Sequence, residues 1–143
     1  MTGGGGGRTV SVIMPTLNRA HLLGRAVASV LRIPCAMPLD VLIVDDGSTD
    51  DTAARCTRLK SAHPQVRVLR QKNTGVAGAR NLGLRSLLPE TRIVTFLDSD
   101  DVRAPDRFEH DMALLQSEPE LDMTYGCIMQ VTGIDEDSLT PAT

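Results

Sequence analysis

The sequence lacks an excess of charge of either sign. Its 143 residues include 15 Lys and Arg against 18 Asp and Glu, which gives a formal net charge of −3. Proteins that bind nucleic acid or an anionic membrane through their overall electric field need a strongly basic surface. The composition excludes that mode of binding, and we expect no nucleic-acid partner.

Cysteines and long apolar runs are also scarce. The three cysteines, Cys35, Cys56 and Cys127, are widely spaced without a CxxC pair, which fits a reduced compartment better than a disulfide framework. No window reaches the roughly 18 apolar residues that a membrane-spanning helix needs, and the start lacks a basic segment followed by an apolar one. We therefore expect a soluble, cytoplasmic protein without an integral membrane segment, and peripheral attachment to a membrane stays open.

Short apolar runs bounded by Gly, Pro, Asn or Asp recur along the chain. Their length and β-branched content predict buried strands, at residues 9–14, 40–45, 66–71, 92–97 and 121–126. The segments between them have helical spacing, and we expect Asp50 or Asp51 to cap the second helix and Pro105 to lie in the first turn of the last. This alternation predicts an α/β domain with a mostly parallel sheet flanked by helices on both faces.

The chain divides into three parts. The glycine run near the start cannot pack into a core, so we expect residues 1–8 to form a flexible leader. Residues 9–129 are expected to form the single domain, and residues 130–143 an irregular C-terminal segment.

Polar residues follow the first four apolar runs. In open parallel sheets, ligands bind beyond the carboxyl ends of the strands, and here those ends carry residues 15–18, 45–48, 73–75 and 98–101. The sequence therefore predicts a binding site at this edge of the sheet.

The segment LDSDD places three carboxylates, Asp98, Asp100 and Asp101, directly after the fourth run. This acidic triad is self-repelling unless positive charge lies between its members, and Mg²⁺ or Mn²⁺ prefers oxygen ligands of this kind. Such a cation would stabilise a diphosphate as a leaving group. The alternative is a solvated acidic turn or an acidic cluster at the N-terminus of a helix.

Two further motifs place candidate binding residues at the same edge. Asp45 and Asp46 follow the second run, where a carboxylate can accept hydrogen bonds from a base N–H or ribose hydroxyls. Gly47 permits a tight turn after them, although Asp-Gly-Ser is also ordinary turn chemistry. Arg80 lies about one helical turn into the helix after the third run, where it can pair with a phosphate or serve as a surface cation.

Four motifs in order resemble the successive N-terminal motifs of the inverting family 2 glycosyltransferases, which have the GT-A fold. They are SVIMPTLNRAHLL, VLIVDDGSTDDT, NTGVAGARNLGL and FLDSDD. The resemblance runs from Thr9 to about Met129. It implies the nucleotide-sugar-binding portion of an enzyme that transfers a sugar from a nucleoside diphosphate to an acceptor hydroxyl, on a glycan, a lipid or another molecule.

The resemblance also implies roles for particular residues. Nucleotide-sugar binding would involve Pro15, Thr16, Asp45, Asp46, Arg80, Asp98 and Ser99, with Asp46 at the base and Asp98 on the ribose or sugar side. Asp100 would bind a divalent cation, Mn²⁺ or Mg²⁺, together with Asp98 and Asp101. Uridine diphosphate sugars are the default donor because they are common in the family.

The chain departs from the family pattern at two places. Leu17 stands where an aromatic residue is usual, which weakens stacking on the base. The carboxylate general base of inverting members lies well downstream of the acidic triad, so we expect the chain to be truncated before the acceptor half. The acidic run at residues 135–137 follows too soon to replace that base, and we expect it to be solvent-exposed.

Two other functions remain as alternatives at this point. One is a non-catalytic fragment that binds the donor without transfer. The other is a phosphatase of the haloacid dehalogenase type, because LDSDDV also fits its nucleophile motif. That motif normally opens its domain, whereas here it follows the fourth strand.

Overall fold

A computed structural model describes residues 8–126, 128 and 130, and this part of the chain forms four strands and four helices. In chain order they are β1 (Thr9–Thr16), α1 (Ala20–Leu31), β2 (Leu39–Asp45), α2 (Thr52–Ala62), β3 (Val66–Arg70), α3 (Gly75–Arg85), β4 (Thr91–Phe96) and α4 (Arg107–Ser117). The predictions for residues 1–7 and for the acidic run at 135–137 lie outside the described residues. No helix in the described part is long and apolar enough to cross a membrane.

The four strands form one parallel sheet in the order β3-β2-β1-β4. Strands β1 to β3 therefore extend the sheet in one direction, and β4 adds to the opposite side of β1. The strand order reverses between β1 and β4, which is where open α/β sheets bind their ligands at the carboxyl ends.

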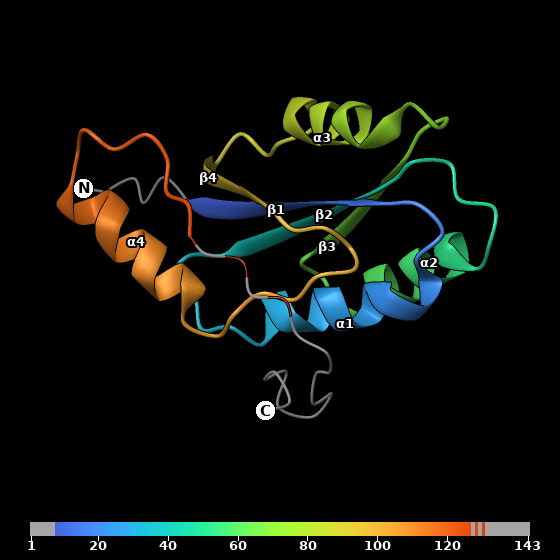
Figure 1. Ribbon diagram of the computed structural model, residues 1–143, viewed down its shortest axis with the longest axis horizontal. Coiled ribbons are helices and arrows are strands. Elements are labelled where there is room, and N and C mark those ends of the chain that lie inside the picture. Colours follow the sequence, from blue (N-terminus) through green and yellow to red (C-terminus); the bar gives the residue numbers. More distant parts are fainter. Residues whose placement is uncertain (1–7, 127, 129, 131–143) are drawn as a thin grey trace, which may run out of the picture.

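Helices cover both faces of this sheet (Figure 1). Helix α3 lies over one face, and α1 and α2 lie over the other. The larger core cluster lies on the α1 and α2 side and includes Val12, Met14, Leu23, Val27, Ile43 and Phe108. The smaller cluster lies under α3 and includes Ile13, Leu42, Val44 and Ala79. The predicted parallel sheet with helices on both faces is confirmed.

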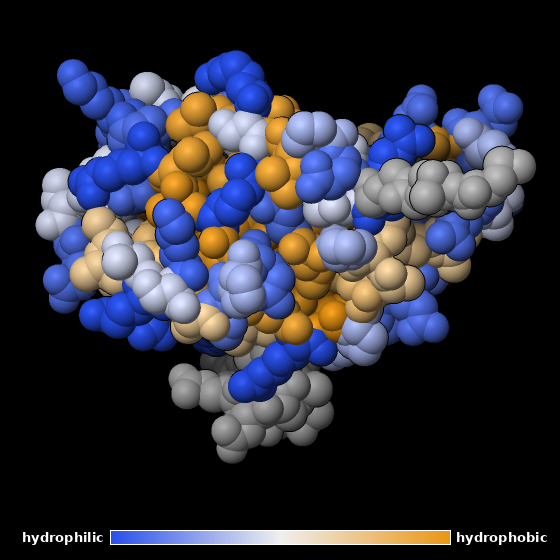
Figure 2. Space-filling model, turned by 180° about the vertical axis from the view of Figure 1, so that it is seen from behind, coloured by the Kyte–Doolittle hydropathy of each residue, from blue (hydrophilic) through white to orange (hydrophobic). Residues whose placement is uncertain are grey.

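The central strands are buried and the edge strands are less so. All eight residues of β1 are buried, whereas β4 has no fully buried residue and Phe96 at its end is 41% exposed. In the view from behind, apolar residues reach the surface in the middle of the molecule (Figure 2). The helices above and below thus leave sheet edges partly accessible.

A polar belt crosses all four strands under α3. The buried Asp40 carboxylate accepts hydrogen bonds from Nε and Nη2 of Arg67, at 2.7 and 2.8 Å, and from Oγ of Ser11 at 2.9 Å. Ser11 Oγ also lies 2.9 Å from Oγ1 of Thr91, and Arg67 Nη2 donates to the Ser86 carbonyl beyond α3 at 3.0 Å. The four strand residues of the belt lie in the amino-terminal halves of their strands, at the end of the sheet opposite the predicted site. They are Ser11, Asp40, Arg67 and Thr91.

Two predictions about local structure are wrong. Residues 121–126 form no strand and pair with no strand of the sheet, and the side chains of Met123 and Tyr125 are 75% and 91% exposed. Pro105 lies before α4, which begins at Arg107 with Asp106 as its N-cap residue. At α2 the N-cap residue is Asp51, which makes no side-chain capping hydrogen bond. The N–H of Thr52 is instead accepted by Oδ1 of Asp50, one residue earlier, at 2.9 Å.

Cys56 is a core residue of the α1 and α2 side, 1% exposed. Burial raises the pKa of its thiol to about 11, and the nearby charge of Asp45 adds to the effect. The thiol is therefore neutral at ordinary pH and acts as a small apolar group.

Candidate functional site

Asn18 ties the loop after β1 to the loop after β2. Its side-chain Oδ1 accepts the N–H groups of Thr49 and Asp50, at 2.8 and 3.3 Å, and its own N–H donates to Ser48 Oγ at 2.9 Å. Its φ is +51°, a conformation that Asn tolerates better than most residues because its side chain makes local hydrogen bonds. The two loops therefore form one rigid wall at the carboxyl ends of β1 and β2.

The Asp45 side chain is buried and stabilises the turn after β2. Its side chain is 1% exposed, and Oδ1 accepts the N–H of Ser48 at 2.9 Å. Arg70 Nη1 lies 3.5 Å from Oδ2. The predicted tight turn is present, with Gly47 at φ +87°. Asp45 thereby fixes the direction in which its neighbour Asp46 points.

Asp46 joins this turn to the start of α3. Its Oδ1 accepts Nε2 of Gln71 and the N–H of Thr74, both at 2.8 Å, and its Oδ2 accepts the N–H of Gly75 at 3.0 Å. Burial alone would raise the pKa of Asp46, but these hydrogen bonds together hold it below the usual 3.8. A carboxylate at a helix N-terminus also meets the positive end of the helix dipole. Asp46 is therefore ionised and rigidly placed.

The structure brings the acidic triad together. Asp98, Asp100 and Asp101 each present an oxygen within 4.8 Å of the others, in the turn that follows β4. Burial and the two neighbouring carboxylates raise the pKa of Asp101. This spacing allows a single cation to bridge the three side chains, and oxygen donors suit Mg²⁺ or Mn²⁺.

Two arginines compensate part of the triad's charge. Arg80 Nη2 donates to Asp98 Oδ1 at 2.8 Å, and its guanidinium lies 5.6 Å from the centre of the Phe96 ring. Arg80 is the sixth residue of α3, somewhat deeper in the helix than expected. Arg19 Nε lies 4.0 Å from Asp100 Oδ2. Guanidinium groups thus flank both sides of the candidate cation site.

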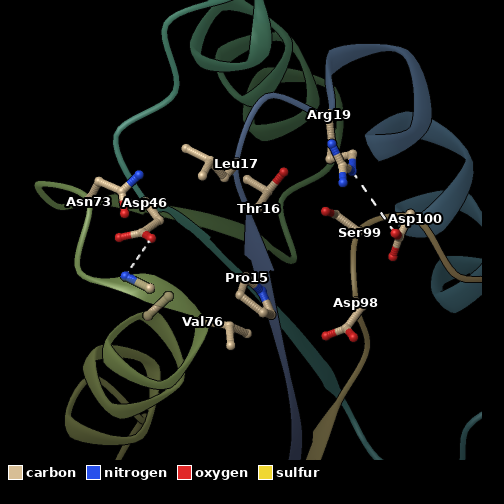
Figure 3. A pocket seen from close by; sticks show the side chains of 12 residues that line it. Pro15, Thr16, Leu17, Arg19, Asp46, Asn73, Val76, Asp98, Ser99 and Asp100 are labelled. Atoms are coloured by element: carbon tan, nitrogen blue, oxygen red, sulfur yellow. Dashed lines mark hydrogen bonds and ion pairs between the residues drawn. The ribbon is translucent and has the colours of Figure 1, made fainter.

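A pocket of about 260 Å³ lies between Asp46 and the triad (Figure 3). Asp46 and Asn73 lie on one side of it and Arg19, Ser99 and Asp100 on the other, with Pro15 between them. This volume is slightly below the roughly 300–1,000 Å³ of small-molecule sites. The pocket therefore suits part of a nucleotide-sized ligand rather than the whole.

Most of the predicted binding residues line this pocket, namely Pro15, Thr16, Asp46, Asp98, Ser99 and Asp100. Asp45, Arg80 and Asp101 do not line it, although each contacts or adjoins a residue that does. Thr16 Oγ1 is buried and has no hydrogen-bond partner among the described residues. A buried polar atom of this kind calls for an explanation, and a ligand in the adjoining pocket would supply one.

The pocket lining also includes Leu17, Asn73 and Gly75, from the segments after the strands where the sequence predicts a site. It further includes three residues to which sequence reasoning assigned no binding role, namely Arg19, Val76 and Ala79. Arg19 could have been found from its position, since it stands three residues after the end of the first strand. Val76 and Ala79 gave no such signal, because their place depends on how α3 lies over the sheet.

Comparison with known proteins decides the family. Residues 11–138 match the family described as Glycosyl transferase family 2. The chain belongs to this family. The match includes both aspartate motifs and the whole acidic triad, so the resemblance of the four motifs is confirmed.

Relatives and solved structures that are similar to this chain agree with this assignment. An uncharacterized glycosyltransferase of Rickettsia felis is 37% identical over 107 residues, which are 75% of this chain and 17% of that protein. The structure of Staphylococcus aureus TarS 1-349 with UDP has a TM-score of 0.67 and 26% identity, over 78% of this chain and 33% of that one. The chain therefore spans about a sixth of the length of this curated relative.

A second solved structure is the mannosyltransferase PcManGT from Pyrobaculum calidifontis in complex with GDP-Man and Mn²⁺. Its TM-score is 0.65 at 30% identity, over 74% of this chain and 32% of that one. The GT-A fold predicted from the family resemblance is confirmed by both structures.

Proposed function

We propose that this domain binds a nucleoside diphosphate sugar together with a divalent cation, as the donor-binding part of a glycosyltransferase. The observation that carries the proposal is the pocket between Asp46 and the acidic triad, at the point where the strand order reverses. The acceptor would be a hydroxyl group of a glycan, a lipid or another molecule.

The nucleoside would lie on the Asp46 side of the pocket. Within the described part of the chain, Oδ1 of Asp46 accepts hydrogen bonds from Gln71 and Thr74, and Oδ2 accepts one from the N–H of Gly75. A carboxylate oxygen can accept a second hydrogen bond, so Oδ2 remains available to an N–H of the base. Pro15, Leu17 and Val76 supply apolar surface for the ring, and the hydroxyl of Thr16 gains a partner.

The cation would lie at the acidic triad, where the three carboxylates offer hard oxygen ligands at the required spacing. When bound, Mn²⁺ or Mg²⁺ supplies positive charge that stabilises the diphosphate as it leaves the sugar. Asp98 and Ser99 would face the ribose or sugar, Asp100 and Asp101 would hold the ion, and Arg80 would remain beside the nucleotide through its contact with Asp98. The similarity to TarS in complex with UDP and to PcManGT in complex with GDP-Man and Mn²⁺ supports a nucleotide-sugar donor and a divalent cation as the ligands.

The transfer step also needs a group that removes the proton from the acceptor hydroxyl. We assign no residue to this role, and a domain that binds the donor without transferring the sugar remains the second candidate. The phosphatase alternative loses its support, because residues 11–138 belong to a glycosyltransferase family.

Calorimetric titration of the 143-residue chain tests the proposal. We expect UDP or GDP to bind in the presence of Mn²⁺ and to lose most of that binding when a chelator removes the ion. A folded sample that binds neither nucleotide under either condition would refute the proposal. Binding that ignores the chelator would refute the cation's role alone.

A further inference from the structure

Arg19 is a pocket residue to which the family resemblance assigned no role. It precedes α1, and its N–H donates to Oγ1 of Thr52 at 3.0 Å, which fixes its backbone. Its side chain points toward Asp100, which lies on the same side of the pocket (Figure 3). The backbone contact does not depend on the guanidinium, whose Nη1 donates a long hydrogen bond of 3.3 Å to the exposed Asn18 carbonyl. The guanidinium can therefore turn toward the pocket without disturbing the backbone.

The contact between Arg19 and Asp100 is loose. Their closest charged atoms are 4.0 Å apart, and the two side chains are 45% and 50% exposed. By contrast, Arg80 forms a 2.8 Å hydrogen bond with Asp98. Exposed ion pairs of the looser kind contribute little, so Arg19 can exchange Asp100 for a stronger anion at small cost.

We propose that Arg19 holds Asp100 when no cation is bound and moves onto the phosphates of the donor when the cation takes Asp100. The inference rests on the proposed function. A cation between the carboxylates would repel the Arg19 guanidinium, whose Nε lies 4.0 Å from Asp100 Oδ2, while the diphosphate brings negative charge into the same pocket. The guanidinium fork matches phosphate oxygens. Arg19 thereby couples the binding of cation and diphosphate.

The proposal predicts effects of opposite sign for one substitution, Arg19→Gln. Mn²⁺ alone should bind about two- to fivefold more tightly, because Asp100 loses a competing cation. UDP in the presence of Mn²⁺ should bind about tenfold more weakly, because a charged hydrogen bond to phosphate is lost. Uridine, which has no phosphate, should bind the variant and the wild type equally. A residue that only supports the fold would weaken all three.

The experiment titrates Mn²⁺, UDP with Mn²⁺, and uridine into the wild type and three variants. Arg19→Lys keeps the charge and should recover part of the UDP affinity. Arg58→Gln removes an exposed arginine of α2 that does not line the pocket, and it should leave all three affinities unchanged. Thermal unfolding confirms that each variant is folded.

Three outcomes overturn the inference. If the wild type binds UDP and Arg19→Gln binds it equally well, the inference fails and the proposed function stands. If Arg19→Gln loses uridine and UDP affinity alike, or binds Mn²⁺ less tightly, Arg19 supports the pocket's shape rather than the phosphates. If the wild type binds no nucleotide with Mn²⁺, the proposed function fails and the inference fails with it.

Discussion

Replacing Asp40 with Asn tests whether the amino-terminal end of the sheet stabilises the fold without affecting ligand binding at the carboxyl end. Asp40 is 3% exposed and accepts two hydrogen bonds from Arg67 and one from Ser11. Asn keeps the shape of the side chain but removes its charge. An NH₂ group then replaces one of the two carboxylate oxygens and faces the hydrogen-bond donors of Arg67 or Ser11. The polar belt then contains an arginine without its counter-ion.

The expected loss can be estimated from burial. Removing one partner of a fully buried ion pair destabilises a protein by about 3–5 kcal/mol. Here only the aspartate is fully buried, because the Arg67 side chain is 33% exposed and water can rehydrate part of it. We therefore expect Asp40→Asn to lower the free energy of unfolding by about 2–3 kcal/mol. A domain with a typical stability of roughly 5–15 kcal/mol remains folded after this loss.

Urea denaturation and nucleotide titration of the same variant provide the assay. Asp40 lies five residues before Asp45 on β2, about 17 Å from the pocket edge of the sheet, so the affinity for UDP with Mn²⁺ should stay unchanged. The double variant Asp40→Leu with Arg67→Met should recover most of the lost stability, because apolar side chains can replace a buried pair. An unfolding loss below about 0.5 kcal/mol, or a clear loss of UDP affinity in the folded variant, would refute this reasoning.

Three further predictions concern the pocket and the core. Asp100→Asn should weaken Mn²⁺-dependent UDP binding at least about tenfold, whereas Asp135→Asn should change it little, as calorimetry can show. The lowered pKa of Asp46 means that its hydrogen bonds stabilise the fold fully above 3.8, the usual pKa, and are lost as the pH falls through the lowered value. Thermal unfolding between pH 5 and pH 2, chosen as roughly bracketing that range, should therefore show acid destabilisation that Asp46→Asn reduces. Gly83→Ala should destabilise the chain by about 1–3 kcal/mol in urea, because its Cβ would lie 2.6 Å from Ile13 Cγ2.

Each of these three predictions has a control variant or a result that would contradict it. Equal losses for the two aspartate variants would count against the acidic triad as the cation site. An Asp46→Asn melting curve parallel to that of the wild type at every pH would remove the link to its pKa. Gly24→Ala is the control for Gly83, because its Cβ would meet only the flexible end of the Arg55 side chain. It should be neutral or stabilise α1 by about 0.5–1 kcal/mol.

The sequence correctly predicted the strands in which an apolar run is also buried in the sheet. Four apolar runs form strands because each is paired and covered. The run at 121–126 has similar apolar content, but no strand pairs with it, and Met123 and Tyr125 face solvent. Pairing is a tertiary property that apolar content alone does not report. The strand order escaped prediction for the same reason.

The candidate site was predictable where residues follow strand ends and harder to predict where helices set the geometry. Asp46 and the acidic triad were found because they directly follow strands. The partner of Arg80 is Asp98. This pairing depends on how α3 lies over β1 and β2, next to the turn that follows β4, and not on the motif around Arg80. Arg19 was missed although it follows β1 closely, since an arginine at the start of a helix is common on any surface.

The position of each strand along the chain also determines which part of the pocket can form first during synthesis. Ser11 on β1 contacts Asp40 on β2, which follows it by 29 residues in the chain. Its other partner, Thr91 on β4, follows it by 80 residues and is synthesised much later. The ribosome releases the N-terminal residues first, and near contacts close faster than distant ones. The wall that carries Thr16 and Asp46 can therefore form on a nascent chain that has not yet gained a single carboxylate of the acidic triad, and the cation half of the pocket is added last.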